Sequence, residues 1–477
     1  MIKIFNVNER VSAFYSSDSL GLVYCVKNDT DKVFEAIKKR DTSDKNLQEL
    51  INALSNDGFY DNKKVSTKRP IRTLYFCTSY NCNLECSYCL MCRSISCGRT
   101  KERLSDKNII RAIKKFIDMS EPNTEREVVI YGGEPTLYPD MIKFIYKSVR
   151  KYEKESEAHL LPSRFILCTN GINIDSDIAK FIKESGIYPA VSFDGYPELH
   201  NKYRTSCSSS DTFSLSKTGY NTLRELGVDT GITIALGSHT VEELPEIIKY
   251  LNEIFSPRTV AANSMLDFDN NDNEWLPDTD LLLESLWKTF ILCRDEGVYL
   301  VKSIMDNRVK PFVEREPRVW GCTGTGARLG VIPDGRIVPC MALSHKFVAD
   351  VDSINKIDDI CPEELMNASP YIRSECTDCE ARATCGGGCP AVNILSGISD
   401  TSLDKGNCKI SKAFLKRMII LLWETLDRDD LVMERGYYLP TYEDRRRLYG
   451  TIKVESKNID YQYIPEKETS LNENYSN

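Results

Sequence analysis

Three cysteines on one short loop offer the clearest chemistry in this chain of 477 residues. Cys82, Cys86 and Cys89 are separated by three and then two residues, directly after a run of residues typical of a strand. Three thiolates on one loop can bind three irons of a cubane iron-sulfur cluster and leave the fourth iron without a protein ligand. A zinc loop is the alternative, but structural zinc normally takes four nitrogen or sulfur ligands. The spacing therefore favours a cluster with one iron open to another ligand.

Seven more cysteines follow in the second half of the chain. In order they are Cys322, Cys340, Cys376, Cys379, Cys385, Cys389 and Cys408, with Gly335 between the first two. The segment around them, 320–408, is rich in glycine, proline and cysteine and has little apolar mass. We therefore expect bound metal to contribute to its folding. Taken alone, the four middle cysteines also suit a pair of zinc knuckles.

The elements that must position these cysteines alternate between β-rich and amphipathic segments from residue 72 onward. This alternation is typical of β/α units around a parallel sheet. Strands are expected at Thr73–Thr78, Val128–Tyr131, Phe165–Thr169, Ala190–Phe193, Ile232–Leu236 and Val260–Asn263. Helices with apolar residues at three- and four-residue spacing are expected at Lys107–Met119, Met141–Tyr152, Asp177–Glu184, Val241–Phe255 and Lys412–Leu426. The six strands predict a partial barrel, in which functional residues follow the strand ends.

The first cysteine loop resembles the signature of the radical S-adenosylmethionine (SAM) superfamily, including an aromatic residue, Tyr88, just before the third cysteine. The resemblance implies an α/β fold with a partial (β/α)6 TIM-like barrel. It also implies that the open iron binds SAM and passes it one electron, which yields methionine and a 5′-deoxyadenosyl radical. Cys82, Cys86 and Cys89 are then the catalytic cluster ligands.

Motifs after the next strands resemble positions that hold SAM in this superfamily. Gly132, Gly133 and Glu134 match a GGE motif, in which glycines allow close backbone approach and the carboxylate accepts from the SAM ammonium. The resemblance extends the SAM contacts to Asn170, Ser192, Arg204 and Leu236. Arg204 can pair with a carboxylate or be a solvated surface charge, and Leu236 can pack on adenine or belong to the core.

The seven downstream cysteines resemble the C-terminal SPASM domain of peptide-modifying radical SAM enzymes, which carries two auxiliary 4Fe-4S clusters. The resemblance assigns Cys322, Cys340 and Cys389 to the nearer cluster. To the farther cluster it assigns Cys376, Cys379, Cys385 and Cys408. Sulfatase-maturing relatives have a further cysteine just before the first, but residues 315–321 contain none. The nearer cluster is thus one ligand short, and thioether-forming maturases of the ranthipeptide type are thought to hold a substrate thiolate at such a cluster.

Four regions are expected along the chain. They are an N-terminal module (1–70), the radical SAM barrel (71–310), the SPASM domain (311–430) and a polar C-terminal tail (431–477). In the module a β-like pair precedes two helix-like stretches, Asp31–Lys39 and Asn46–Ser55. This layout resembles the winged-helix-like element that binds leader peptides by adding them as an edge strand. A structural cap on the barrel is the alternative.

Composition limits the expected partners and location. The chain has 62 Lys+Arg against 70 Asp+Glu and a formal charge of -8, which disfavours nucleic acid and anionic membranes as partners. No apolar run reaches the roughly 18 residues of a membrane span, and the first residues lack the layout of a secretory signal, so we expect a cytoplasmic protein. In that reducing compartment, cysteines are metal ligands or thiols before they are disulfides. Cys92 and Cys97, just past the first loop, can be redox-active or bind a further group.

These patterns together predict a radical SAM oxidoreductase with three 4Fe-4S clusters, one for SAM and two auxiliary. Its substrate is expected to be a ribosomally made, cysteine-containing precursor peptide, in which it installs a thioether crosslink, with flavodoxin or ferredoxin as reducing partner. Sulfatase-type oxidation is disfavoured, because sulfatase maturases carry an acidic residue after the cysteine that matches Cys340, where this chain has Met341. Two alternatives stay open: a carbon-carbon crosslinking or dehydrogenating enzyme of the same group, and a zinc-stabilised peptide-binding protein without catalysis.

Overall fold

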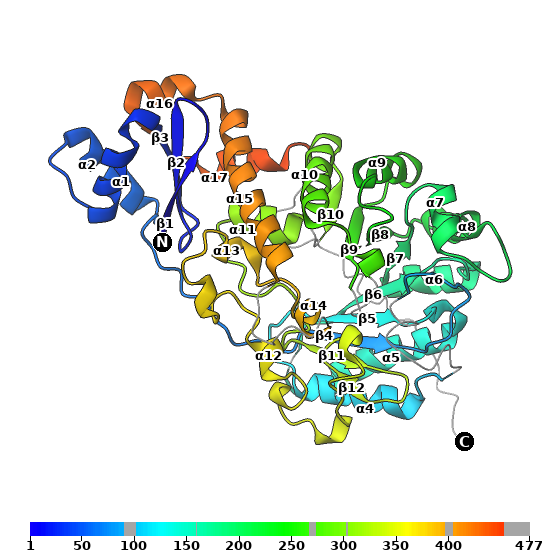
Figure 1. The fold of residues 1–477 in the computed structure, drawn as a ribbon. Helices are drawn as coiled ribbons and strands as arrows, with labels where there is room; N and C mark the ends of the chain where they lie inside the picture. The colour runs from blue at the N-terminus through cyan, green and yellow to red at the C-terminus, as the bar shows by residue number, and fades with distance from the viewer. Residues whose placement is uncertain (90–101, 159, 267–272, 302–303, 396–403, 453–477) are drawn as a thin grey trace, which may run out of the picture.

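The computed structural model describes residues 1–89, 102–158, 160–266, 273–301, 304–395 and 404–452. Cys92 and Cys97, for which a redox or ligand role was considered, lie outside the described residues. Figure 1 shows a large α/β body on one side, a small N-terminal module at the opposite end, and the cysteine-rich segment between them.

The large body is built on a single twisted sheet. Among the described residues the sheet has nine strands in the order β10-β9-β8-β7-β6-β5-β4-β11-β12. Their bounds are β4 Thr73–Cys77, β5 Glu127–Tyr131, β6 Arg164–Thr169, β7 Tyr188–Ser192, β8 Gly231–Leu236, β9 Thr259–Ser264, β10 Tyr299–Val301, β11 Arg328–Val331 and β12 Ile337–Val338. Strands β4 to β10 run parallel, and β11 from the cysteine-rich segment pairs parallel with β4. The barrel and the cysteine-rich segment therefore share one sheet.

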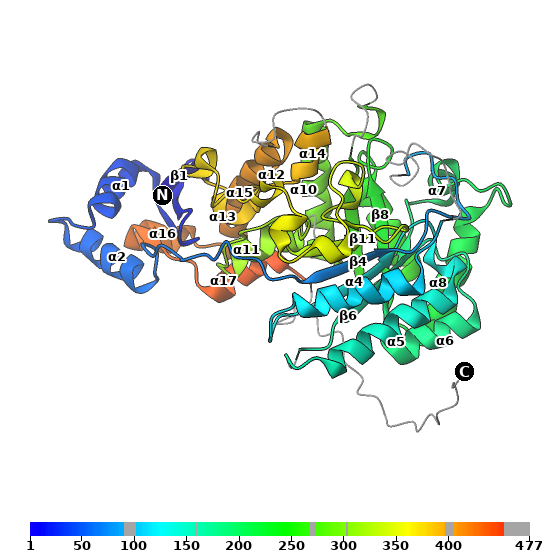
Figure 2. The ribbon, with the colours of Figure 1, turned by 90° about the horizontal axis from the view of Figure 1, so that it is seen from below.

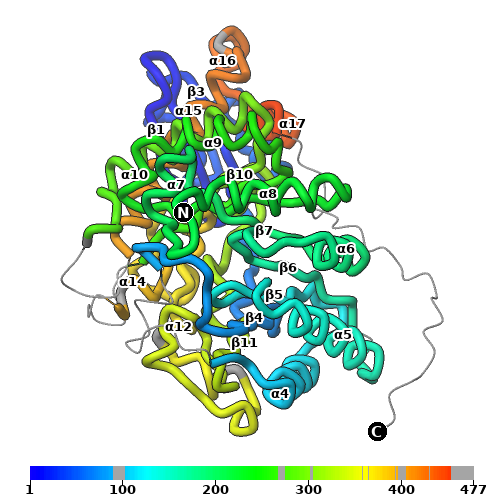
Figure 3. The backbone as a smooth tube through the Cα atoms, turned by 90° about the vertical axis from the view of Figure 1, so that its right-hand side faces the viewer, coloured from blue at the N-terminus to red at the C-terminus, as the bar shows by residue number. Residues whose placement is uncertain are grey.

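Helices connect these strands and cover the outer face of the sheet. They are α4 Asp106–Asp118, α5 Pro139–Glu155, α6 Ser176–Ser185, α7 Pro197–Tyr203, α8 Thr212–Glu225, α9 Leu244–Phe255 and α10 Thr279–Glu296. Figures 2 and 3 show α4, α5 and α6 along one side of the strands. Each is amphipathic; α4, for example, buries Ile109, Ile113 and Phe116. One face of the sheet is thereby closed by apolar packing.

The alternation of side chains along a strand decides which residues face the barrel interior. On β8, Ile232, Ile234 and Leu236 are buried in the hydrophobic core, whereas Thr233 and Ala235 between them keep partial exposure. Successive side chains on a strand point to opposite faces, so Thr233 and Ala235 face the interior of the barrel. Residues at such inward positions are the ones available to a ligand.

The cysteine-rich segment forms short helices that lie across the open side of the barrel. They are α11 Lys310–Val313, α12 Glu363–Met366, α13 Arg382–Cys385 and α14 Pro390–Leu395, followed by the long α15 Lys405–Leu426. Figure 3 shows α12 and α14 on the side of the strands opposite to α5 and α6. α15 packs against α10 through ring contacts of Phe414 with Trp287 and Phe290.

The N-terminal module combines both ends of the described chain. Its sheet has the order β1-β2-β3-β13, with β1 Ile2–Asn6, β2 Val11–Ser16, β3 Leu22–Val26 and β13 Tyr437–Tyr438. Its helices are α1 Thr30–Lys39, α2 Lys45–Asn56 and α16 Asp429–Arg435; α17 Tyr442–Arg446 follows and packs on α11 and α15. Tyr24 of β3 donates to the Ile419 carbonyl of α15 at 2.7 Å and contacts the Trp423 ring. The module is therefore packed onto the cysteine-rich domain.

The structure confirms the predicted partial barrel, and all six expected strands form at their predicted places. It differs from the sequence analysis at the start of the predicted polar tail, where α16, β13 and α17 are ordered elements. Within the described residues, no helix combines the length and the apolar character needed to cross a membrane.

Candidate metal centres at the carboxyl end of the barrel

The Cys82–Cys89 loop leaves the end of β4 and is held in place by the segment that follows α7. The amide of Glu85 donates to the Thr205 carbonyl at 2.6 Å, and the amide of Ser87 donates to the Tyr203 carbonyl at 3.0 Å. Inside the loop, the amide of Leu84 lies 3.4 Å from Cys82 Sγ. These hydrogen bonds fix the backbone of the loop that carries the three cysteines.

The paired glycines of the GGE motif are required by this loop. A Cβ on Gly133 would lie 2.0 Å from the carbonyl oxygen of Asn81, and a Cβ on Gly132 would lie 2.7 Å from that of Ser79. Gly132 also adopts a φ of +141°, which favours glycine. In this structure the glycines let the end of β5 pack directly under the cysteine loop.

Glu134 is almost fully buried and joins the ends of two strands. Its carboxylate accepts from the Thr136 amide and hydroxyl, from the Thr169 hydroxyl at 2.7 Å, and from the Asn170 amide at 2.7 Å. Burial raises the pKa of Glu134, and the hydrogen bonds act in the opposite direction. Its predicted contact with the SAM ammonium stays a prediction. Asn170, also buried, turns its amide toward Asn83 Oδ1 at 2.6 Å and Cys82 Sγ at 3.9 Å.

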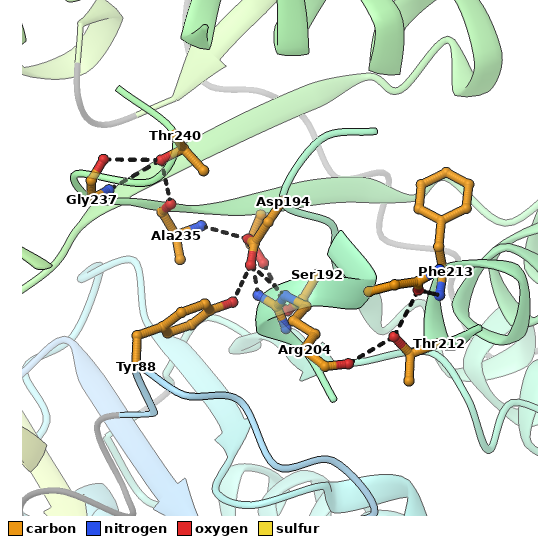
Figure 4. Close-up of polar contacts among 11 residues, drawn as sticks. Tyr88, Ser192, Asp194, Arg204, Thr212, Phe213, Ala235, Gly237 and Thr240 are labelled. Carbon is orange, nitrogen blue, oxygen red and sulfur yellow. Dashed lines mark hydrogen bonds and ion pairs between the residues drawn. The ribbon is translucent and has the colours of Figure 1, made fainter. Parts of the chain in front are cut away.

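Figure 4 shows that Tyr88 and Arg204 both point toward Asp194, which lies just beyond the end of β7. Arg204 donates to Asp194 from Nε at 2.7 Å and from Nη2 at 3.2 Å, Tyr88 donates through its hydroxyl, and the Ala235 amide donates at 3.0 Å. Burial acts to raise the pKa of Asp194, but the Arg204 charge and the hydrogen bonds outweigh burial and hold the pKa at about 2. Arg204 is therefore a buried ion-pair residue, and the solvated-surface interpretation is wrong.

Aromatic side chains enclose Tyr88 on its other face. Its ring stacks on His239 with centroids 5.1 Å apart and meets Trp275 edge-on at 5.8 Å, while Tyr203 contacts both of these residues. The Arg204 guanidinium lies 5.6 Å from the Tyr88 ring centroid. The aromatic residue of the cysteine loop is thus fixed by an ion pair and by ring packing.

Three separate segments bring Cys322, Cys340 and Cys389 together. Gly324 lies between the first two, since a Cβ there would be 3.5 Å from Cys322 Sγ and 3.8 Å from Cys340 Cβ. Gly321 packs against the glycine run just before Cys389, with the Gly386 carbonyl 3.0 Å from an added Cβ. Burial, together with the charges of the other two thiols, raises the pKa of Cys389 to about 12. Such thiols become thiolates most readily when a cation binds them.

The other four downstream cysteines form a second group around the start of α15. Burial raises the pKa of Cys408 to about 12, and the neighbouring charges of Cys385, Cys376 and Cys379 act in the same direction. Asn407 Nδ2 lies 3.1 Å from Cys385 Sγ. The two groups match the division that the SPASM resemblance implies, and the ligand assignments themselves remain proposals.

Within the described residues, no three His, Cys, Asp or Glu side chains are placed to hold one metal ion. Sets of three and of four thiols suit iron-sulfur cubanes. In a cubane each thiolate binds a different iron, so the ligands surround the cluster without meeting at a point. Glycines that keep room beside Cys322 and Cys340 and the partial exposure of both thiols fit such a group.

Of the two remaining predicted SAM contacts, one faces the barrel interior and the other lies in the hydrophobic core. Ser192, at the end of β7, faces the interior and shares a hydrogen bond of 3.1 Å with Thr233. Leu236, for which adenine packing was considered, is fully buried in the core, because strand alternation turns it toward the helices. Sequence reasoning missed the role of Asp194, for which the Ser-Phe-Asp-Gly run at the β7 end was a usable signal.

Comparisons with known proteins agree with this geometry. The model of the radical SAM superfamily matches residues 76–251. A cysteine-type anaerobic sulfatase-maturating enzyme of Clostridium novyi is 25% identical over 371 residues, covering 72% of this chain and 93% of the relative. The radical SAM cyclopropyl synthase TigE of Paramaledivibacter caminithermalis is 23% identical over 397 residues, covering 75% of each chain.

Among solved structures, native anSMEcpe with bound AdoMet and Kp18Cys peptide aligns with a TM-score of 0.59 at 20% identity, covering 75% of this chain and 99% of that chain. This likeness shows a shared fold. Residues 76–251 therefore form a domain of the radical SAM superfamily, in a chain that is similar to radical SAM maturases.

Proposed function

We propose that this protein is a radical SAM maturase that installs a crosslink, a cysteine thioether, in a ribosomally made precursor peptide. The observation that carries the proposal is the meeting of Cys322, Cys340 and Cys389 beside the interior of a radical SAM barrel. Three protein thiolates on a cubane leave one iron for a substrate thiolate. The peptide substrate is supported by the solved relative that carries a cysteine-named peptide.

Two other thiols, Cys293 and Cys361, are candidates for a fourth protein ligand of this group. Cys293 lies in the hydrophobic core on α10, where burial raises its pKa to about 12. Cys361 is buried in an apolar cluster with Leu365, against which Cys340 and Cys389 also pack, and its Sγ lies 3.7 Å from the Gly324 carbonyl. The proposed count of three rests on the SPASM resemblance, which assigns Cys322, Cys340 and Cys389 to this group. Cys361, which that resemblance does not assign, is the alternative fourth ligand.

The residues of the chain divide the work of such a reaction. A 4Fe-4S cluster and SAM, bound at the first loop, supply a 5′-deoxyadenosyl radical for hydrogen abstraction. Asp194 and Arg204 hold Tyr88, and through it the loop, in one orientation. Tyr131 neighbours Cys89 of the first loop, and Tyr75, whose ring meets Tyr131 edge-on, neighbours Cys340 of the nearer auxiliary group. The farther group, whose sulfurs neighbour Asn407, offers a route for electrons to a flavodoxin- or ferredoxin-like partner.

The sulfatase-maturating relatives make formylglycine formation the competing function within the same domain. Against it stands Met341, in the place where an acidic base is expected in sulfatase maturases. Its side chain is buried, and its Cε would lie 3.0 Å from a Cβ on Gly330 of β11. A methionine cannot accept a proton there, so the position lacks the base that such an oxidation needs.

The N-terminal module is proposed to hold the leader segment of the precursor. Its sheet has two edges, and β13 already covers the β3 edge. Strand β1 is the remaining edge, and Ile4 on it is 41% exposed. An extended peptide can add to such an edge through main-chain hydrogen bonds.

The test is anaerobic co-expression with a short cysteine-rich peptide encoded beside the gene, followed by tandem mass spectrometry. Loss of two hydrogens per modified cysteine, with alkylation blocked at that cysteine, is the expected result. Replacement of a cysteine sulfur by an aldehyde oxygen would instead establish formylglycine formation. Hydrogen loss with every cysteine still alkylatable would establish the carbon-linked alternative. A colourless, zinc-containing protein that leaves the peptide unchanged would overturn the enzyme proposal.

A further inference from the structure

Arg328 is a basic side chain that places its charge beside the nearer auxiliary group of cysteines. It begins β11, the strand that extends the barrel sheet next to β4. Its Nη2 lies 4.0 Å from Cys322 Sγ, and Nη2 and Nε donate to the Thr323 hydroxyl at 2.8 and 3.1 Å. The guanidinium is thereby aimed at the first thiol of the group and fixed by the next residue of the loop.

The other side of Arg328 faces the barrel interior. Its Cζ lies 5.0 Å from the centroid of the Tyr75 ring, and Tyr75 in turn meets Tyr131 edge-on at 5.4 Å. A guanidinium keeps its charge at every pH at which the protein is folded.

We infer that Arg328 is a positioning residue that holds the thiolate of the peptide substrate beside Cys322, Cys340 and Cys389. The inference rests on the proposed function and names the group of the substrate that is recognised. A cubane with three thiolates carries a net charge near -1, and a fourth thiolate makes it more negative. A fixed positive charge 4.0 Å from Cys322 Sγ lowers the free-energy cost of adding a further anion to the same group, because the site is buried and of low dielectric. The thiol proton leaves to solvent, and no electron is transferred.

Arg69 and Arg318 do not share this role. Arg69 donates to the backbone carbonyls of Cys322 and Thr325, and Arg318 donates to the Gly321 carbonyl. Both arginines therefore hold the backbone of the loop. Arg328 is the arginine of the three with a hydrogen bond to a ligand sulfur and a ring contact inside the barrel.

The experiment compares anaerobically reconstituted holoprotein with the variants Arg328→Gln and Arg328→Lys. Arg336→Gln is the matched control, because Arg336 lies in the turn after β11 but its side chain is 54% exposed. Electron paramagnetic resonance is used to follow a redox titration and the addition of L-cysteine, with S-methyl-L-cysteine as a probe that cannot form a thiolate.

We expect Arg328→Gln to shift the potential of one cluster to a more negative value and to weaken L-cysteine binding by about tenfold or more. Arg328→Lys should restore the potential, because it keeps the charge, and Arg336→Gln should match the wild type. An unchanged potential and unchanged cysteine binding in Arg328→Gln would overturn the inference, as would a potential shift that Arg328→Lys does not restore. Absence of a cysteine response in the wild type would instead overturn the open-iron part of the proposed function, and the potential of Arg328→Gln would still decide the role of Arg328.

Discussion

Asp194 illustrates how one buried carboxylate links several strand ends at the candidate site. Its carboxylate accepts hydrogen bonds from Tyr88 of the cysteine loop, from Arg204 at the end of α7 and from the Ala235 amide of β8. A buried carboxylate without such partners costs several kcal/mol, so these four residues are mutually dependent. Arg204 was named from the sequence alone, but its partner was not, because ion pairing between strand ends depends on how the strands are ordered in space.

His200 adds a pH dependence of folding close to this network. It is fully buried on α7 against Phe193 and Phe213, and within the described residues neither ring nitrogen has a hydrogen-bond partner. Burial, reinforced by the Arg204 charge, lowers its pKa from 6.5 to about 3. The unfolded chain takes up a proton below pH 6.5 and the folded chain does not, so stability is present above that pH and is lost as the pH falls.

We predict that this histidine removes about 2 kcal/mol of folding stability between about pH 7 and pH 5. His200→Phe should lack that part of the pH dependence, whereas His345→Gln, at an exposed position, should retain it. Urea unfolding without oxygen at the two pH values gives the comparison. An equal pH dependence in His200→Phe and the wild type would show that His200 is not the group responsible.

At the scale of elements, the β5 end and the cysteine loop are fitted to each other by glycine. The Gly-Gly-Glu run was recognised in the sequence as a motif for a ligand. The structure shows a second reason why glycine is needed at this position, since Gly133 approaches the Asn81 carbonyl too closely for any side chain. That contact joins residues far apart in sequence, so composition and periodicity could not reveal it.

Gly133→Ala is predicted to displace the cysteine loop and to prevent assembly of the first cluster. The reason is the 2.0 Å approach that an added Cβ would make to Asn81. Iron analysis after anaerobic reconstitution should find about four irons fewer per chain, the content of one cubane. Gly186→Asn is the control, because an added Cβ there meets nothing within 4 Å and asparagine tolerates its φ of +65°. Full iron content in Gly133→Ala would contradict the fit between the two elements.

At the scale of the whole molecule, the last described segment joins the N-terminal sheet to the rest of the protein. Residues 429–438 add α16 and β13 to the β3 edge, whereas α17 and the residues up to 452 pack on α11, α15 and the end of α10. The segment buries Val432, Leu448, Tyr449 and Ile452. The sequence analysis predicted the barrel strands well, because each carries its own alternating pattern. It missed this return of the chain, because the segment is short and polar and its pairing partner lies at the opposite end of the sequence.

Truncation after Arg428 is therefore predicted to destabilise both the N-terminal module and the packing of α10, α11 and α15. Each buried apolar side chain contributes roughly 1.5–3 kcal/mol, so the loss is on the order of 5 kcal/mol or more, together with an exposed β3 edge. A chain that ends at Ile452 keeps every described contact and serves as the control. Thermal unfolding should show a lower midpoint or aggregation only in the shorter chain, and equal midpoints would contradict the shared module.

The central claim, that Cys82, Cys86 and Cys89 hold the cluster that cleaves SAM, is tested most directly by measuring 5′-deoxyadenosine. Anaerobically reconstituted wild-type protein, Cys86→Ala and Cys207→Ala are each incubated with SAM and dithionite, and the product is quantified by liquid chromatography. Cys207 is exposed and belongs to none of the three cysteine groups. We predict deoxyadenosine from the wild type and from Cys207→Ala, and none above background from Cys86→Ala. Undiminished deoxyadenosine from Cys86→Ala would contradict the account.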